Sequence, residues 1–141
     1  MKMNWTKYAV MAALIAGGAV IVTKFFDGAG RSSSTTSRIV NVTVPDLSPV
    51  AANGQELFND NCAACHGENG KGTEMGPPLI HPIYKPSHHA DISFELAVAN
   101  GVRKHHWPYG NMPAQPHITR ADLQQIVRFV RETQQANGIL N

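Results

Sequence analysis

The sequence is short of cysteine: only two occur among its 141 residues, Cys62 and Cys65. A structural zinc site needs four ligands, and no second cysteine pair is present to supply two of them. A histidine pair would have to complete such a site, and the candidates are His88 with His89 and His105 with His106. A thioredoxin-like dithiol belongs in a βαβ unit, and no alternating apolar pattern flanks these cysteines. Both kinds of site are therefore disfavoured.

An excess of charge of one sign is also missing. The 12 Lys and Arg nearly balance the 10 Asp and Glu, so the formal net charge is +2. Residues 1–49 hold five of the basic residues against two acidic ones, which leaves seven against eight in residues 50–141. Without a basic face we expect no nucleic acid partner, and long-range steering of a charged partner should be modest.

A long apolar run is lacking as well. Residues 9–23 carry no charge, but a transmembrane helix usually needs about 20 apolar residues. One interpretation is a cleavable signal peptide, with a basic start and a small-residue site at residues 16–19. The other is an uncleaved anchor, because aromatic residues and lysines suited to the membrane interface flank the stretch. These are Trp5, Lys7, Lys24, Phe25 and Phe26.

We favour a transmembrane anchor over residues 1–26. Cleavage near Ala19 would leave Val20-Ile21-Val22 at the start of the product, which does not suit a soluble N-terminus. The excess of positive charge on the short N-terminal side places that side in the cytoplasm. The rest of the chain is then expected on the periplasmic side of the cell membrane.

Residues 27–49 read as a flexible linker, because they begin with small polar residues that cannot pack. Residues 38–44 (RIVNVTV) alternate in character and can instead pair as a short strand or pack on the following domain. We favour the extended linker. A tether of this kind lets the domain that follows move between neighbouring membrane complexes without diffusing away.

The two cysteines stand in the motif Cys62-Ala63-Ala64-Cys65-His66. Cys-x-x-Cys-His is the attachment signature of c-type haem. Two thiols one helical turn apart can each add to a vinyl group of one porphyrin, and the next histidine can supply the proximal nitrogen to the iron. We therefore predict one haem c, bound covalently through Cys62 and Cys65, with His66 as an iron ligand.

Further segments around this motif follow a family pattern in the same order along the chain. They are Gly54-x-x-Leu57-Phe58, then Gly76-Pro77-Pro78-Leu79, then Asn111-Met112-Pro113, and finally an amphipathic helix from Thr119. In this the chain resembles the monohaem class I cytochromes c, in a membrane-anchored form. The resemblance covers roughly residues 50 to 137. It implies an all-α haem domain over residues 50–141, with three main helices and long loops around one covalent haem.

The first helix is expected over residues 51–61 from its apolar spacing. Phe58 and Cys62 are four residues apart and share a face, which should meet the haem and the last helix. Gly54 lets another helix approach closely, as the family's crossing of its first and last helices suggests.

The second and third helices are expected over residues 91–101 and 119–137. Asp91 is expected to cap the start of the second. Thr119 and Asp122 form a capping-box-like start for the third. Its apolar stripe consists of Leu123, Ile126, Val127 and Val130.

The resemblance also implies roles on the proximal side of the haem. The Pro77 carbonyl would accept a hydrogen bond from His66, and such a bond fixes the tautomer and basicity of a ligating imidazole. Leu79 would pack on the porphyrin. The alternative for the Pro77-Pro78 pair is simple stiffening of the loop.

Met112 matches the family's axial-methionine loop and would complete the iron coordination opposite His66. Met75 is only nine residues past His66 and is too near to cross easily to the other face. His105 and His106 are alternative sixth ligands. Methionine is a soft, neutral donor that raises the reduction potential, and a filled sixth position leaves no place for a substrate.

The stretch Arg103-Lys104-His105-His106-Trp107 departs from a generic cytochrome. Its interpretations are a solvated basic loop with Trp107 against the haem, hydrogen bonds to haem propionates, a docking patch, or a copper site. The resemblance does not decide between them. The remaining histidines are His81, His88, His89 and His117.

The function expected is one-electron transfer between membrane-associated respiratory or dehydrogenase complexes, and not catalysis. A fixed haem subunit of such a complex is the nearest alternative. An enzyme or sensor with an open iron would require that Met112 not ligate. A copper-handling module would use the paired histidines.

Overall fold

The structure is a computed structural model that describes residues 39–141. The expected anchor or signal segment over residues 1–26 and most of the expected linker lie outside the described residues. None of the helices in the described part has the length and apolar character that a membrane span requires.

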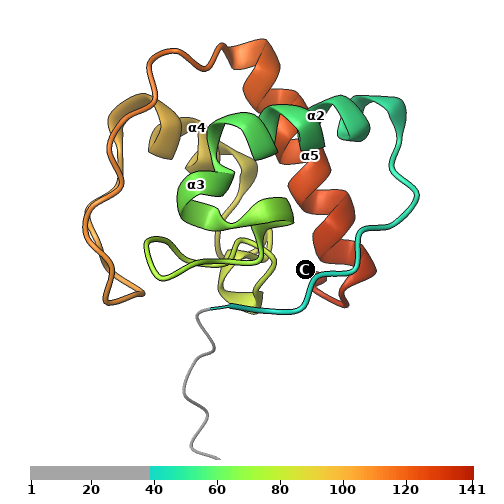
Figure 1. The fold of residues 1–141 in the computed structure, drawn as a ribbon, viewed down its shortest axis with the longest axis horizontal. Helices are drawn as coiled ribbons and strands as arrows, with labels where there is room; N and C mark the ends of the chain where they lie inside the picture. The colour runs from blue at the N-terminus through green and yellow to red at the C-terminus, as the bar shows by residue number, and fades with distance from the viewer. Residues whose placement is uncertain (1–38) are drawn as a thin grey trace, which may run out of the picture. The chain divides into compact units, whose positions relative to one another are not determined.

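The described chain is mostly helical (Figure 1). Its elements are α2 (Pro49–Asn61), α3 (Ala63–His66), the short 3₁₀ turns η1 (Glu68–Gly70) and η2 (Pro82–Tyr84), α4 (Asp91–Asn100) and α5 (Arg120–Ala136). Within residues 39–141 no strand forms, and β pairing is limited to one isolated antiparallel bridge between Val102 and Met112. The expectation of three main helices separated by long loops is confirmed by α2, α4 and α5.

Helix α2 crosses α5 at very short range (Figure 1). A Cβ added to Gly54 would lie 2.0 Å from the backbone oxygen of Gln125, so only glycine permits this approach. Phe58, one turn further along α2, packs against Phe129 with ring centroids 5.6 Å apart. Both rings are buried, and the crossing of α2 and α5 therefore supplies the centre of the core.

Helix α5 begins as the sequence predicts. The Thr119 hydroxyl accepts a hydrogen bond from the Asp122 amide at 3.2 Å, which satisfies one of the free amides of the first turn. The stripe residues Leu123, Ile126, Val127 and Val130 are buried. Buried Thr133 and Gln134 continue the stripe with polar side chains.

Helix α4 starts differently from the expectation. The N-cap is Ala90, which offers no side-chain cap, and Asp91 is the first helical residue. The Asp91 carboxylate instead accepts a hydrogen bond from Arg131 Nε at 2.8 Å. The predicted cap was therefore wrong because a contact with a distant helix uses that side chain. Gly101 ends α4 with a φ of 73°, which glycine adopts readily.

Residues 39–48 also differ from the expected extended linker, since their backbone bonds residues of the domain that follows. The Val40 amide donates to the Lys71 carbonyl at 2.8 Å. Asn137 bonds both the amide and the carbonyl of Thr43, at 3.0 and 2.7 Å. These contacts are of the kind that the alternative interpretation of residues 38–44, packing on the following domain, expected; the linker over residues 27–49 as a whole stays a prediction.

Candidate functional site

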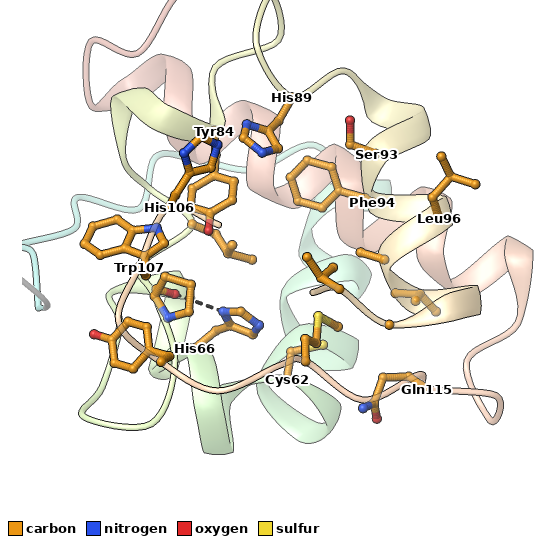
Figure 2. Close-up of a pocket in the computed structure, with 18 of the residues that line it drawn as sticks. Cys62, His66, Tyr84, His89, Ser93, Phe94, Leu96, His106, Trp107 and Gln115 are labelled. Carbon is orange, nitrogen blue, oxygen red and sulfur yellow. Dashed lines mark hydrogen bonds between the residues drawn. The ribbon is translucent and has the colours of Figure 1, made fainter. Parts of the chain in front are cut away.

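A largely apolar cavity of about 790 Å³ lies between the helices and the two long loops. Its volume is within the range of about 300–1,000 Å³ typical of ligand pockets. Every main helix contributes to it, with Phe58 from α2, Phe94 from α4 and Ile126 from α5 among the lining residues. Figure 2 shows side chains from these elements directed toward a common space.

His66 is the last residue of α3, and a hydrogen bond at one nitrogen of its ring determines which nitrogen remains available as a ligand. Its Nδ1 donates a hydrogen bond to the Pro77 carbonyl at 2.9 Å (Figure 2), the contact expected from the sequence. Because a carbonyl can only accept, Nδ1 carries the proton and Nε2 keeps a lone pair. Burial lowers the pKa of His66, against the opposing effect of the Pro77 bond. The lowered pKa favours the neutral ring, which is the form that binds metal.

The two cysteines have different surroundings. Cys62 lines the cavity, and burial, with the nearby Cys65, raises the pKa of its thiol to about 11. Cys65 is exposed and is not among the lining residues. The Cys65 carbonyl meets the following loop so closely that a Cβ on Gly76 would lie 2.7 Å from its oxygen. Neither thiol is in a disulfide, so both are available for covalent attachment.

The two candidate methionines of this domain are clearly separated. Met112 lines the cavity, and its backbone pairs with Val102 through hydrogen bonds of 2.9 and 3.0 Å. A Cβ on Gly101 would come within 2.5 Å of the Met112 carbonyl, so the glycine that ends α4 lets this loop close against it. Met75 is 65% exposed and lies outside the lining. Of the two, only Met112 is among the residues that line the cavity.

Leu79 and Trp107, both expected to contact the haem, line the cavity. Leu79 is 9% exposed and belongs to the core cluster. The Nε1 of Trp107 is buried and has no hydrogen-bond partner within residues 39–141. Burial raises the pKa of the Tyr84 hydroxyl to about 12, and the nearby Trp107 side chain partly opposes this rise. A buried donor of this kind requires an acceptor.

These residues fit a c-type haem. The cavity has largely apolar walls, and His66, Met112 and Cys62 are among its lining residues, with the second cysteine one helical turn away. The unpaired Trp107 N–H would suit a propionate oxygen of the bound group. A porphyrin with two carboxylates has an apolar body that matches the apolar walls and a polar edge that can accept the Trp107 hydrogen bond.

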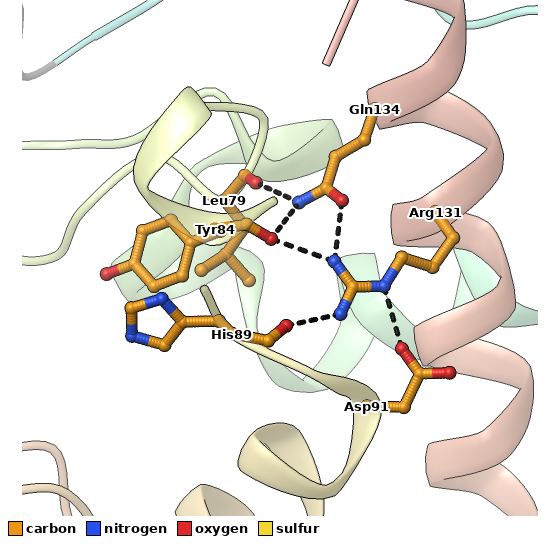
Figure 3. A network of polar contacts seen from close by, with 6 residues as sticks. All are labelled: Leu79, Tyr84, His89, Asp91, Arg131 and Gln134. Carbon is orange, nitrogen blue, oxygen red and sulfur yellow. Dashed lines mark hydrogen bonds and ion pairs between the residues drawn. The ribbon is translucent and has the colours of Figure 1, made fainter. Parts of the chain in front are cut away.

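Sequence reasoning missed the polar network that holds one wall of the cavity (Figure 3). Arg131 donates to the carbonyls of Tyr84 and His89, and Gln134 donates to the carbonyls of Leu79 and Tyr84. The available signal was Gln134 itself, which follows Val130 by four residues and so extends the apolar stripe with an amide. A polar side chain on a buried stripe usually has a specific partner.

The structure also brings together histidines that the sequence left unassigned. His88, His89, His105 and His106 come from two loops and line the same cavity. His81 caps η2 and contacts the Trp107 ring at a centroid distance of 5.1 Å. His117 is exposed and does not line the cavity.

Residues 51–134 match the family model of cytochrome c. Over 85 residues the chain is 38% identical to lupanine 17-hydroxylase [cytochrome c] of a Pseudomonas species, covering 59% of this chain and 11% of that protein. Over 83 residues it is 32% identical to the cbb3-type cytochrome c oxidase subunit CcoP of Rhodobacter capsulatus, covering 57% and 28%. The chain thus spans under a third of the length of either relative. No solved structure gives a significant match.

Proposed function

This chain belongs to the cytochrome c family, and from that premise we propose that it is a one-electron carrier with a single covalent haem c. Cys62 and Cys65 would attach the group, and His66 and Met112 would be the protein ligands of its iron. Bound there, the haem supplies the Fe(III)/Fe(II) change. The protein supplies the position, the two ligands and a cavity of low dielectric constant.

The observation that carries this proposal is the place of Met112. Its loop is tied to the end of α4 by the paired hydrogen bonds with Val102, and it lines the same cavity as His66. With both residues as ligands, the iron would have no coordination position left for a substrate. The ligand set therefore favours electron transfer over catalysis at the iron.

The partners proposed are membrane-associated redox complexes. Relatives named as cbb3-type oxidase subunits support a respiratory setting, and the expected N-terminal anchor would hold the domain on the periplasmic side. The chain then serves either as a tethered shuttle or as a fixed haem subunit. A relative named as a hydroxylase supports the second candidate, a haem domain that passes electrons from a catalytic partner.

The test is the ferric absorption spectrum of the haem-loaded full chain. We expect a weak far-red sulfur-to-iron band that Met112→Ala abolishes. Met75→Ala is the matched control, because this methionine is exposed, and it should leave the band unchanged. If the wild type lacks the band and binds carbon monoxide rapidly, the iron is open and the electron-carrier proposal fails.

A further inference from the structure

Three histidines outside the proposed haem ligands converge at one edge of the cavity. His88 and His89 follow η2, and His106 comes from the loop between α4 and Met112. One ring nitrogen from each can be chosen so that all three lie within 4.8 Å of one another. In the view of Figure 2, His89 and His106 lie near Tyr84, whereas Cys62 and His66 lie across the cavity. We call His88, His89 and His106 the histidine cluster.

The spacing within the cluster suits one metal ion. The Nε2 atoms of His88 and His106 lie 3.3 Å apart. Two nitrogens bound to one tetrahedral ion at about 2.0–2.1 Å are separated by about 3.3–3.4 Å. The third nitrogen lies within 4.8 Å, so a side-chain adjustment of roughly an ångström completes the set.

His89 is already oriented as metal-bound histidines usually are. Its Nδ1 donates to the Ile83 carbonyl at 2.7 Å, which leaves Nε2 as the nitrogen with a free lone pair. A backbone carbonyl on the second nitrogen is the usual support of a ligating imidazole. Arg131 fixes the backbone of the same residue by donating a hydrogen bond to the His89 carbonyl. This ligand is therefore fixed before any ion arrives.

The chemistry of the cluster selects the class of ion. The only group in residues 39–141 with metal-binding spacing consists of histidines alone, and cations stand nearby, with Arg103 and Lys104 on the same cavity wall. Hard ions such as Mg²⁺ and Ca²⁺ require oxygen ligands. Imidazoles suit copper, zinc and nickel, with Cu²⁺ bound more tightly than Zn²⁺ by a given site.

We propose that His88, His89 and His106 form a second metal site, which binds one copper(II) ion beside the haem. Solvent supplies the remaining ligand, because His88 and His106 are exposed. His105 stacks near His89 at a centroid distance of 6.1 Å, but it is not in the group whose ring nitrogens lie within 4.8 Å of one another. The site goes beyond electron transfer by the haem, since it gives the domain a place for a metal ion taken from solution.

A rival occupant is a haem propionate, which would use the same rings as hydrogen-bond donors. The two occupants make different demands on the haem-loaded protein. A copper site needs lone pairs that remain free after the haem is in place. A propionate would use those rings and leave no room for the ion.

The experiment is a titration of the haem-loaded full chain with copper(II) chloride. Calorimetry measures the binding, and electron paramagnetic resonance identifies the ligands of the copper. We expect one ion per chain and a copper signal with nitrogen hyperfine structure. His106→Ala and His88→Ala should each weaken binding by about 100-fold or more, judged against the effects of about 10–100-fold known for outer-shell groups. His117→Ala is the matched control, since His117 is exposed outside the cavity, and it should change the affinity less than twofold.

The haem absorption spectrum checks that each variant is folded and loaded. Because His88 and His106 are exposed, their replacement should leave that spectrum intact. Absence of saturable copper binding to the haem-loaded chain overturns the proposal. So does binding that survives His106→Ala, or binding seen only before haem is attached, because the cluster would then serve the propionate. Failure of the haem ligand assignments would appear separately, in the far-red band, and leaves the copper titration unaffected.

Discussion

Arg131 donates a hydrogen bond to the backbone carbonyl of His89, 42 residues earlier in the chain (Figure 3). The same guanidinium donates to the Tyr84 carbonyl at 2.8 Å and to the Asp91 carboxylate at 2.8 Å. One side chain of α5 thus fixes the end of η2, the start of α4 and the histidine between them. The last helix sets the shape of the cavity wall as well as the core.

Replacement of Arg131 by Met should destabilise the domain by about 2–4 kcal/mol. The reason is that two carbonyls would lose a charged donor in a partly buried position, and such bonds contribute about 1.5–3 kcal/mol each before relaxation. Denaturant unfolding of the haem-loaded chain measures the loss. Arg120→Met is the control, because Arg120 is 78% exposed in its ion pair with Glu95, and exposed pairs contribute about 0–1 kcal/mol. Equal effects of the two changes would contradict this role of Arg131.

Gly54→Ala should disrupt the crossing of α2 and α5. The added Cβ would meet the Gln125 backbone oxygen at 2.0 Å, and backbone cannot rotate away as a side chain can. We expect a loss of about 3 kcal/mol, the upper part of the usual range for overpacking. Thermal unfolding measures it. Asn53→Ala, an exposed change on the same helix, should shift stability by about 0.5 kcal/mol or less. A Gly54→Ala variant of normal stability would show that the helices do not approach so closely.

Trp107→Phe should lower the reduction potential by a few tens of mV while leaving stability nearly unchanged. The indole N–H is buried without a hydrogen-bond partner in the described part of the chain, and we expect it to bond a haem propionate. Losing the donor leaves more negative charge near the iron, which favours the ferric state. A bond of about 1 kcal/mol corresponds to about 40 mV for one electron. Potentiometry measures the shift.

Tyr84→Phe separates two partners for that indole. If the Trp107 N–H served mainly the Tyr84 hydroxyl, Tyr84→Phe and Trp107→Phe would lower stability alike and leave the potential unchanged. That result would contradict the propionate contact.

Glu132→Gln should detach Ser48, which precedes α2, from α5. It should also remove a pH-dependent contribution to stability. Partial burial alone would raise the pKa of Glu132, but bonds from the amide and hydroxyl of Ser48, at 2.9 and 2.7 Å, and from Arg128 outweigh it. Its pKa is therefore lowered from 4.5. A lowered folded-state pKa stabilises the protein above pH 4.5, and this contribution is lost as the pH falls through the folded value.

At neutral pH we expect Glu132→Gln to lose about 1–2 kcal/mol, and the difference from wild type should shrink below pH 4. Unfolding curves across that range measure it. Glu56→Gln, an exposed change on α2, is the control and should track wild type at every pH. A constant deficit at all pH values would mean that the charge of Glu132 is unimportant.

Local features of the sequence predicted much of this site. The bond between His66 and Pro77 was expected from the resemblance, because the segment Gly76-Pro77-Pro78-Leu79 follows the haem motif after a short loop. The cap at Thr119 and the stripe of α5 were predictable because they depend on residues three or four apart. Gly54 was identified because close helix crossings require the smallest residue.

Other features depended on partners far along the chain. Asp91 was expected to cap α4, but Arg131 lies within reach and offers a stronger, charged bond. Residues 39–48 were expected to be a linker, yet Asn137 and Glu132 bond their backbone. The convergence of His88 and His106, eighteen residues apart, could not be foreseen because it requires two loops to fold against each other.

The sequence by itself therefore determined the chemistry: Cys-x-x-Cys-His defines the cofactor, and the apolar periodicity defines the helices that enclose it. Only the tertiary structure showed that Trp107 Nε1 lacks a hydrogen-bond partner within residues 39–141 and which histidines stand together. The physical reason is that attachment and helix formation depend on neighbours within one or two turns. Burial and ligand geometry depend instead on how α5 draws distant loops onto its surface.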